Sequence, residues 1–120
     1  MDARLREGIG LFNDRRFFEC HEVLEGFYLD TEDANKPFLE GLVQLAAAFR
    51  ICTDFGEIKG PARMVRQALI RFENYQPVFM QVRVAELSAA LEAWAKAIEA
   101  GGATSPAIPK IQLEGFSFFP

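Results

Sequence analysis

The chain has 120 residues, half of them hydrophobic and a quarter charged, with a net charge of −4 and a pI near 5.0. This composition excludes an intrinsically disordered chain, a membrane span of about 18 or more consecutive apolar residues, and a nucleic-acid-binding surface built on clustered Lys and Arg. We therefore expect a single globular domain over residues 1–120, located in the cytoplasm, with neither nucleic acid nor a membrane as a partner.

Apolar residues at helical spacing predict a first helix at residues 3–13 behind the N-cap Asp2 and a second helix at residues 16–29. The polar turn Asn13-Asp14 separates them, so the two helices should form a hairpin. The apolar positions are Leu5, Ile9 and Phe12 in the first helix, and Phe17, Cys20, Leu24, Phe27 and Tyr28 in the second.

A third helix is predicted from a cap at Asn35, with Pro37 in its first turn, to about Cys52. It carries apolar and small residues around most of its circumference, which predicts a central helix with neighbours on more than one side. Gly41 should allow one of those neighbours to approach closely. The buried stripe is predicted to be Phe38, Leu42, Leu45, Phe49 and Cys52.

Residues 54–60 are predicted to be a loop, and Gly60-Pro61 should open a fourth helix that ends at Tyr75-Gln76-Pro77. A fifth helix is predicted at residues 84–100, because Gly101-Gly102 can supply a left-handed cap. The predicted fold class is therefore all-α, a compact bundle of about five helices with its helical core at residues 1–102.

Residues 103–120 have a different pattern, which predicts an extended C-terminal tail. Ile111 and Leu113 alternate with polar residues, as in a strand with one buried side. Phe116, Phe118 and Phe119 follow, and three exposed Phe side chains would be unfavourable in water. We expect the tail to pack on the helical core or on a partner chain, and the second case predicts a homo-oligomer.

Five polar residues at helical spacing are the candidate functional group. His21 and Glu25 are one turn apart, Glu22 and Glu25 form a second adjacent pair, and Glu40 and Gln44 repeat the spacing on the third helix. If the second and third helices pack face to face, all five can line one pocket. An imidazole between carboxylates is suited to general acid/base catalysis, so His21, Glu22, Glu25 and Gln44 are the predicted catalytic residues, acting on an unidentified small molecule.

The same cluster predicts a divalent metal site with His21, Glu22 and Glu25 as ligands. Oxygen ligands with one nitrogen suit Mn, Fe or Mg better than a structural Zn site of several Cys or His, and Zn stays the fourth candidate. The zinc-protease motif needs a second His four residues after the first, and that position is Glu25, so this class is excluded.

The segment LFNDRRFFECHEVLE at residues 11–25, an Asn-containing turn leading into a His-Glu helix, resembles the signature of the domain-of-unknown-function 309 family. The resemblance continues at residues 38–46 and 56–60 and spans roughly residues 9–75. Members of that family are all-helical and are sometimes labelled metal-dependent hydrolases, so the resemblance implies a helical fold and points to the His-Glu cluster. Two positions depart from the family: Tyr28 stands where members carry Trp, and Gly56-Glu57 where they carry Gly-Asn.

Two non-enzymatic interpretations compete with the site. In one, the His and Glu side chains form a buried network that fixes helix register in an interaction domain, and in the other the chain is a homo-oligomeric scaffold. Lys59, Arg63 and Arg66 share a helix face that we expect to be solvated. Cys20 and Cys52 are expected to be reduced, with Cys20 in the core.

Overall fold

The computed structural model describes residues 1–102 and 106–115. Within these ranges the chain forms five α-helices and two short 3₁₀ turns and contains no β-strand, which confirms the predicted all-α class. No helix in these ranges has the length and hydropathy to cross a membrane. In chain order the elements are α1 (Ala3–Asn13), α2 (Phe17–Asp30), a 3₁₀ turn (Asp33–Asn35), α3 (Lys36–Phe55), α4 (Lys59–Phe72), a second 3₁₀ turn (Glu73–Tyr75) and α5 (Val84–Glu99).

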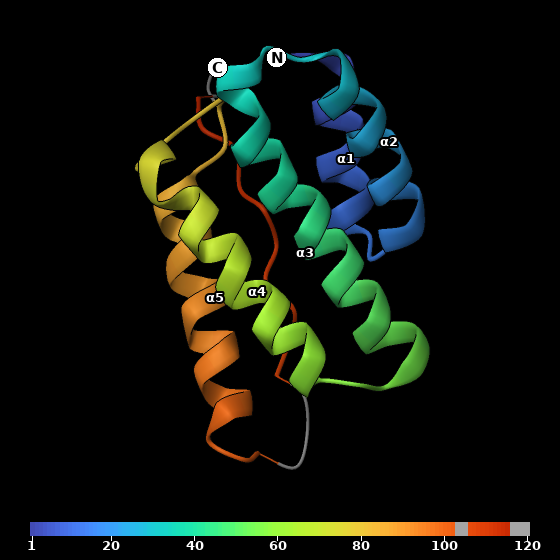
Figure 1. Cartoon of the computed structure of the whole chain (residues 1–120), viewed down its shortest axis with the longest axis vertical. Helices are drawn as coiled ribbons and strands as arrows, with labels where there is room; N and C mark the ends of the chain where they lie inside the picture. The colour runs from blue at the N-terminus through green and yellow to red at the C-terminus, as the bar shows by residue number, and fades with distance from the viewer. Residues whose placement is uncertain (103–105, 116–120) are drawn as a thin grey trace.

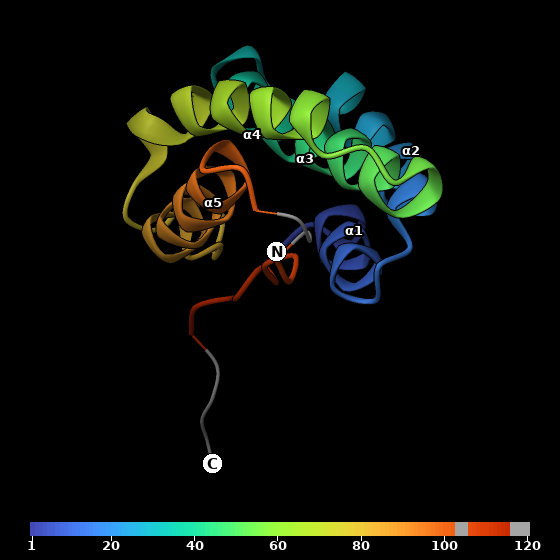
Figure 2. The same ribbon diagram turned by 90° about the horizontal axis from the view of Figure 1, so that it is seen from below.

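The helices form two layers. Each helix packs against the next one in the chain, and α3 occupies the middle of the row (Figure 1). Seen from below, α2, α3 and α4 make one curved layer, while α1 and α5 lie on its inner side (Figure 2). No further helix of the described residues covers the outer surface of the α2–α3 pair (Figure 2).

The helix ends differ from the predictions in two places. The Asp2 side chain caps α1 as predicted, accepting a hydrogen bond from the Arg4 amide at 2.8 Å, but the Asn35 side chain makes no capping bond to α3. The loop predicted at residues 54–60 is shorter, because α3 continues to Phe55 and α4 begins at Lys59. Gly56 ends α3 in the left-handed region at φ 69°, which a glycine adopts without strain.

Aromatic rings connect the two layers. Phe12 of α1 contacts Phe17 of α2 at a ring-centroid distance of 5.2 Å, and Phe49 of α3 lies 5.8 Å from Phe12 and 5.0 Å from Trp94 of α5. All four are at most 2% exposed, so Trp94 is a packing residue, as expected. Burial of such rings contributes roughly 1.5–3 kcal/mol each.

The close approach predicted at Gly41 occurs between α3 and α4. A Cβ atom at Gly41 would lie 2.5 Å from Cε1 of Phe72, a ring that is fully buried. Gly8 plays the same part between α1 and α2, where a Cβ would lie 2.5 Å from Leu24. The absence of a side chain at these two positions allows the neighbouring helices to pack tightly.

The tail runs along the inner side of the bundle, between α1 and α5 (Figure 2). Ile111 is 2% exposed, and Asn13 holds its backbone from both sides, donating from Nδ2 to the carbonyl at 2.9 Å and accepting from the amide at 2.8 Å. Leu113 pairs with Val82 in an isolated bridge. Residues 106–115 thus pack on the helices of their own chain.

The last part of the tail prediction cannot be compared with the structure. Phe116, Phe118 and Phe119 lie outside the described residues. The homo-oligomer predicted from them stays a prediction, as does the cytoplasmic location.

Candidate metal centre

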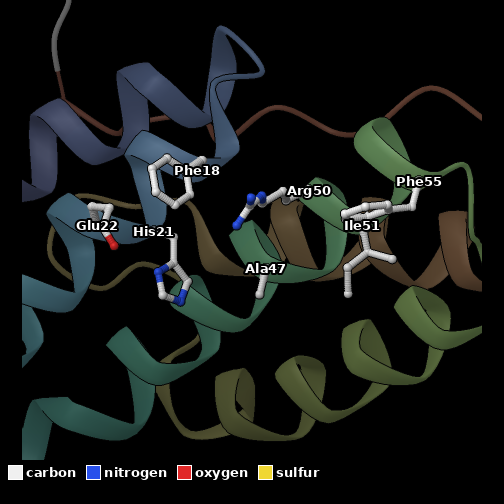
Figure 3. Close-up of a pocket in the computed structure, with 7 residues that line it drawn as sticks. All are labelled: Phe18, His21, Glu22, Ala47, Arg50, Ile51 and Phe55. Carbon is white, nitrogen blue, oxygen red and sulfur yellow. The ribbon is translucent and has the colours of Figure 1, made fainter.

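The three predicted metal ligands lie on one exposed turn of α2. His21, Glu22 and Glu25 each present one ligand atom, and the three atoms are within 4.8 Å of one another. Figure 3 shows the Glu22 carboxylate directed towards the His21 imidazole. The grouping follows from helix geometry, since residues three and four apart meet on the same surface.

The surroundings of these three side chains leave them available to a ligand. His21 is half-buried, whereas Glu22 and Glu25 are exposed. In the part of the chain that the structure describes, none of the three side chains forms a hydrogen bond or an ion pair. The interpretation of this group as a buried network that fixes helix register is therefore wrong.

Glu40 and Gln44 do not join this group. Their side chains turn towards α4, where Gln44 donates to Gln67 Oε1 at 2.6 Å and Glu40 lies 3.7 Å from Arg71 Nη2. Arg71 also donates from Nε to Gln44 Oε1 at 3.4 Å. The amide of Gln44 is thus engaged across the α3–α4 contact, and its catalytic role stays a prediction.

A hollow of about 350 Å³ opens beside the group, between α2 and α3 (Figure 3). His21 and Glu22 form part of its wall, and Phe18 and Phe55, which are 49% and 69% exposed, add large apolar surface. The full lining is Phe18, His21, Glu22, Ala47, Arg50, Ile51 and Phe55. The sequence analysis missed the residues other than His21 and Glu22. A cation on α3 and large apolar residues at surface positions of α2 and α3 were the available signal.

Arg50 is the cation of this hollow. Its guanidinium lies 4.6 Å from the centre of the Phe18 ring, a cation–π contact, and its Nε donates to Asp54 Oδ2 at 3.2 Å. Figure 3 shows the guanidinium extending towards Phe18, with Ile51 and Phe55 on its other side. The charge is therefore held at the hollow by contacts on two sides.

A second, smaller hollow of about 220 Å³ adjoins the group from the opposite end of the α2–α3 surface. It is lined by Glu25, Tyr28, Glu40 and Val43, so Glu25 and Glu40 do share a depression although they make no bond to each other. Lys36 lies 5.4 Å from the centre of the Tyr28 ring. Tyr28 thus borders the candidate centre.

The two cysteines and Arg66 lie outside this group and outside the hollow beside it. Burial raises the pKa of the Cys20 thiol to about 12 and that of the Cys52 thiol to about 11, so neither is a thiolate at neutral pH. Arg66 donates to Glu92 at 2.6 Å and to Glu99 at 2.7 Å, which lowers the pKa of both carboxyl groups. Arg66, one of the three residues of the basic face predicted on α4, is therefore ion-paired with α5.

Comparison with known proteins places the chain in a family. No curated protein matches it. The family described as "Domain of unknown function (DUF309)" matches residues 5–71, more than half of the chain, and this range contains α2, α3 and nearly all of α1 and α4. With the His-Glu turn of α2 inside the matched range, the resemblance read from the sequence is confirmed: the chain belongs to the DUF309 family.

Proposed function

We propose that the protein binds a divalent metal ion through His21, Glu22 and Glu25 and uses it in a hydrolytic reaction. The observation that carries the proposal is the gathering of one imidazole and two carboxylates within 4.8 Å, with no protein cation paired to either carboxylate among the described residues.

The donor set fits such an ion. Ligand atoms bonded to one ion at about 2.1 Å lie about 3–4 Å apart, so atoms within 4.8 Å of one another need only small rotations of exposed side chains. One nitrogen and two carboxylate ligands suit Mn²⁺, Fe²⁺ or Mg²⁺, and Zn²⁺ also accepts this set.

Electrostatics favours the same conclusion. Glu22 and Glu25 are like charges three residues apart on a helix, an arrangement that destabilises it by about 0.2–0.5 kcal/mol. A cation held between them would remove this repulsion. Their exposure leaves room for water or substrate next to the three protein ligands.

A bound divalent ion would supply Lewis-acid activation of water and of a polar substrate bond, which is the chemistry of metal-dependent hydrolysis. The chain's own residues would hold the ion and orient the substrate. Glu22 lines the larger hollow and Glu25 lines the smaller one, so the three ligands lie between two depressions. His21 is half-buried, which limits the positions its ring can take.

The test is metal binding by the protein purified without a chelator or an affinity-tag metal. We expect stoichiometric binding of Mn²⁺, Fe²⁺ or Zn²⁺ in isothermal titration calorimetry, lost in His21→Ala and Glu25→Gln. Glu19→Gln, an exposed carboxylate of the same helix outside the group, is the matched control and should bind as the wild type does. Equal binding by His21→Ala and the wild type would contradict the proposal.

Stability measurements separate this function from a structural role. His21 has no hydrogen-bond partner among the described residues, so His21→Ala should change the free energy of unfolding by less than about 1 kcal/mol. Metal at 100 times its Kd should stabilise the wild type by about 2.7 kcal/mol and leave the variant unchanged. A large loss of stability in metal-free His21→Ala would indicate a structural role.

A further inference from the structure

We propose that the hollow of about 350 Å³ beside the metal centre binds a small monocarboxylate with an aromatic or branched apolar body, whose carboxylate pairs with Arg50. The inference rests on the proposed function, because it names the class of molecule that the metal centre would act on.

The apolar walls indicate the body of the ligand. Phe18 and Phe55 are two of the six large hydrophobic side chains that are exposed among the described residues, and both line this hollow. Apolar surface removed from water contributes about 25 cal/mol per Å², so a ligand that covers both rings is stabilised without any rearrangement of the core. Ile51 adds to the same wall.

Arg50 indicates the charge of the ligand. Its Nε is engaged by Asp54, while its two Nη groups have no partner in residues 1–102 and 106–115. Guanidinium nitrogens arranged as a planar fork bind a carboxylate with two parallel hydrogen bonds. The stack on Phe18 holds this fork at the hollow before any ligand arrives.

The balance of charges favours a carboxylate over a phosphate. Arg50 is the cation among the residues that line the hollow, and Glu22 is an anion in the same lining. Asp54 already engages Arg50 through Nε, so the hollow carries little net positive charge. A dianionic phosphate group would therefore be repelled by Glu22 and Asp54 more strongly than a monocarboxylate is.

The volume limits the size of the ligand. Pockets for drug-sized molecules span about 300–1,000 Å³, and this hollow lies at the lower limit. One ring or a branched chain with a carboxylate fits it. Ala47 lines the hollow with the smallest side chain of the set, and a larger residue there would fill the space.

The experiment uses phenylacetate as the probe, titrated into the ¹⁵N-labelled wild type with and without saturating Zn²⁺ and followed by NMR. We expect amide shifts at residues of the hollow, and affinity at least roughly tenfold higher than for acetate, which lacks the body, or 2-phenylethylamine, which reverses the charge. Arg50→Gln should weaken phenylacetate roughly tenfold to a hundredfold, and Ala47→Leu should abolish binding. Arg6→Gln, an exposed Arg on α1, is the control and should leave the affinity unchanged.

Four outcomes would overturn the inference. They are absence of phenylacetate binding, equal binding by Arg50→Gln, 2-phenylethylamine as good a ligand as phenylacetate, and phenyl phosphate as a better one. A fifth concerns the surface itself: if sedimentation shows dimers that Phe18→Asp dissociates, the hollow is an interface between copies of the chain and the inference is wrong.

Metal titrations of the same proteins keep this inference distinguishable from the proposed function. Metal binding without phenylacetate binding would overturn the inference alone. Phenylacetate binding that depends on Arg50, in a protein that binds no metal, would support the carboxylate site and overturn the metal centre.

Discussion

Gly41→Ala tests the tightest helix contact of the fold. The new Cβ would lie 2.5 Å from Cε1 and 3.0 Å from Cζ of Phe72, distances that force one of the two helices to move. The ring cannot turn away, because it is fully buried and packs on Phe38 at a centroid distance of 5.8 Å. Overpacking of this kind costs about 1–3 kcal/mol, and the better helix propensity of Ala offsets about 1 kcal/mol of that.

Gly26→Ala is the matched control, since Gly26 also lies inside a helix but has no atom within 4 Å of the new Cβ. It should stabilise the protein by about 0.5–1 kcal/mol through helix propensity alone. The net loss for Gly41→Ala should be up to about 2 kcal/mol. Because the propensity gain is common to both variants, they should differ by the overpacking cost of about 1–3 kcal/mol.

The assay is urea unfolding followed by circular dichroism, with unchanged m-values as the check that both variants unfold in the same way. Phe72→Leu added to Gly41→Ala should restore part of the loss, a coupling measurable as a double-mutant cycle. If the two glycine variants prove equally stable, the close approach of α3 and α4 does not disfavour a side chain at residue 41, and the reasoning is wrong.

Three further predictions concern the tail, a strained turn and the buried thiol. Asn13→Ala removes both hydrogen bonds to Ile111, so we expect a loss of about 1–3 kcal/mol and faster hydrogen exchange at the Ile111 amide; an amide that stays protected would contradict this. Gln81→Gly should stabilise the protein by about 0.5–1 kcal/mol in urea unfolding, because Gln81 holds a left-handed φ of 65°; a destabilised variant would refute the strain. Burial raises the pKa of the Cys20 thiol from 9.0 to about 12, so the thiol ionises at lower pH in the unfolded chain than in the folded one. The stability that the buried thiol contributes is therefore complete below pH 9 and declines as the pH rises towards 12. In Cys20→Ala this alkaline decline should be smaller, and rapid labelling of native Cys20 at pH 8 by a thiol reagent would show that the burial is wrong.

Local signals in the sequence predicted the helices well. The first helix has the predicted bounds, and the fifth begins at the predicted residue, because caps and apolar spacing act within a few residues of chain. The loop between α3 and α4 was predicted too long. Its polar residues resemble a loop, but Asp54 and Phe55 continue the helix until Gly56 ends it.

Asn13 has a long-range contact that the neighbouring sequence does not predict. It was predicted to end the first helix, at the turn of the first hairpin, which agrees with the end of α1 at this residue. Its main contact, however, is the backbone of Ile111, 98 residues away. Nothing near Asn13 in the sequence indicates that partner, because the contact depends on the path of the tail between α1 and α5.

The candidate site, too, was predictable only in its local part. By itself the sequence determined that His21, Glu22 and Glu25 share one face of a helix, because the 3.6-residue period places them there whatever surrounds that helix. Only the tertiary structure decided that Gln44 faces α4 while Arg50 faces the hollow. The rotation of α3 about its own axis is set by the burial of its apolar face against the other helices, and no spacing within a single helix contains that information.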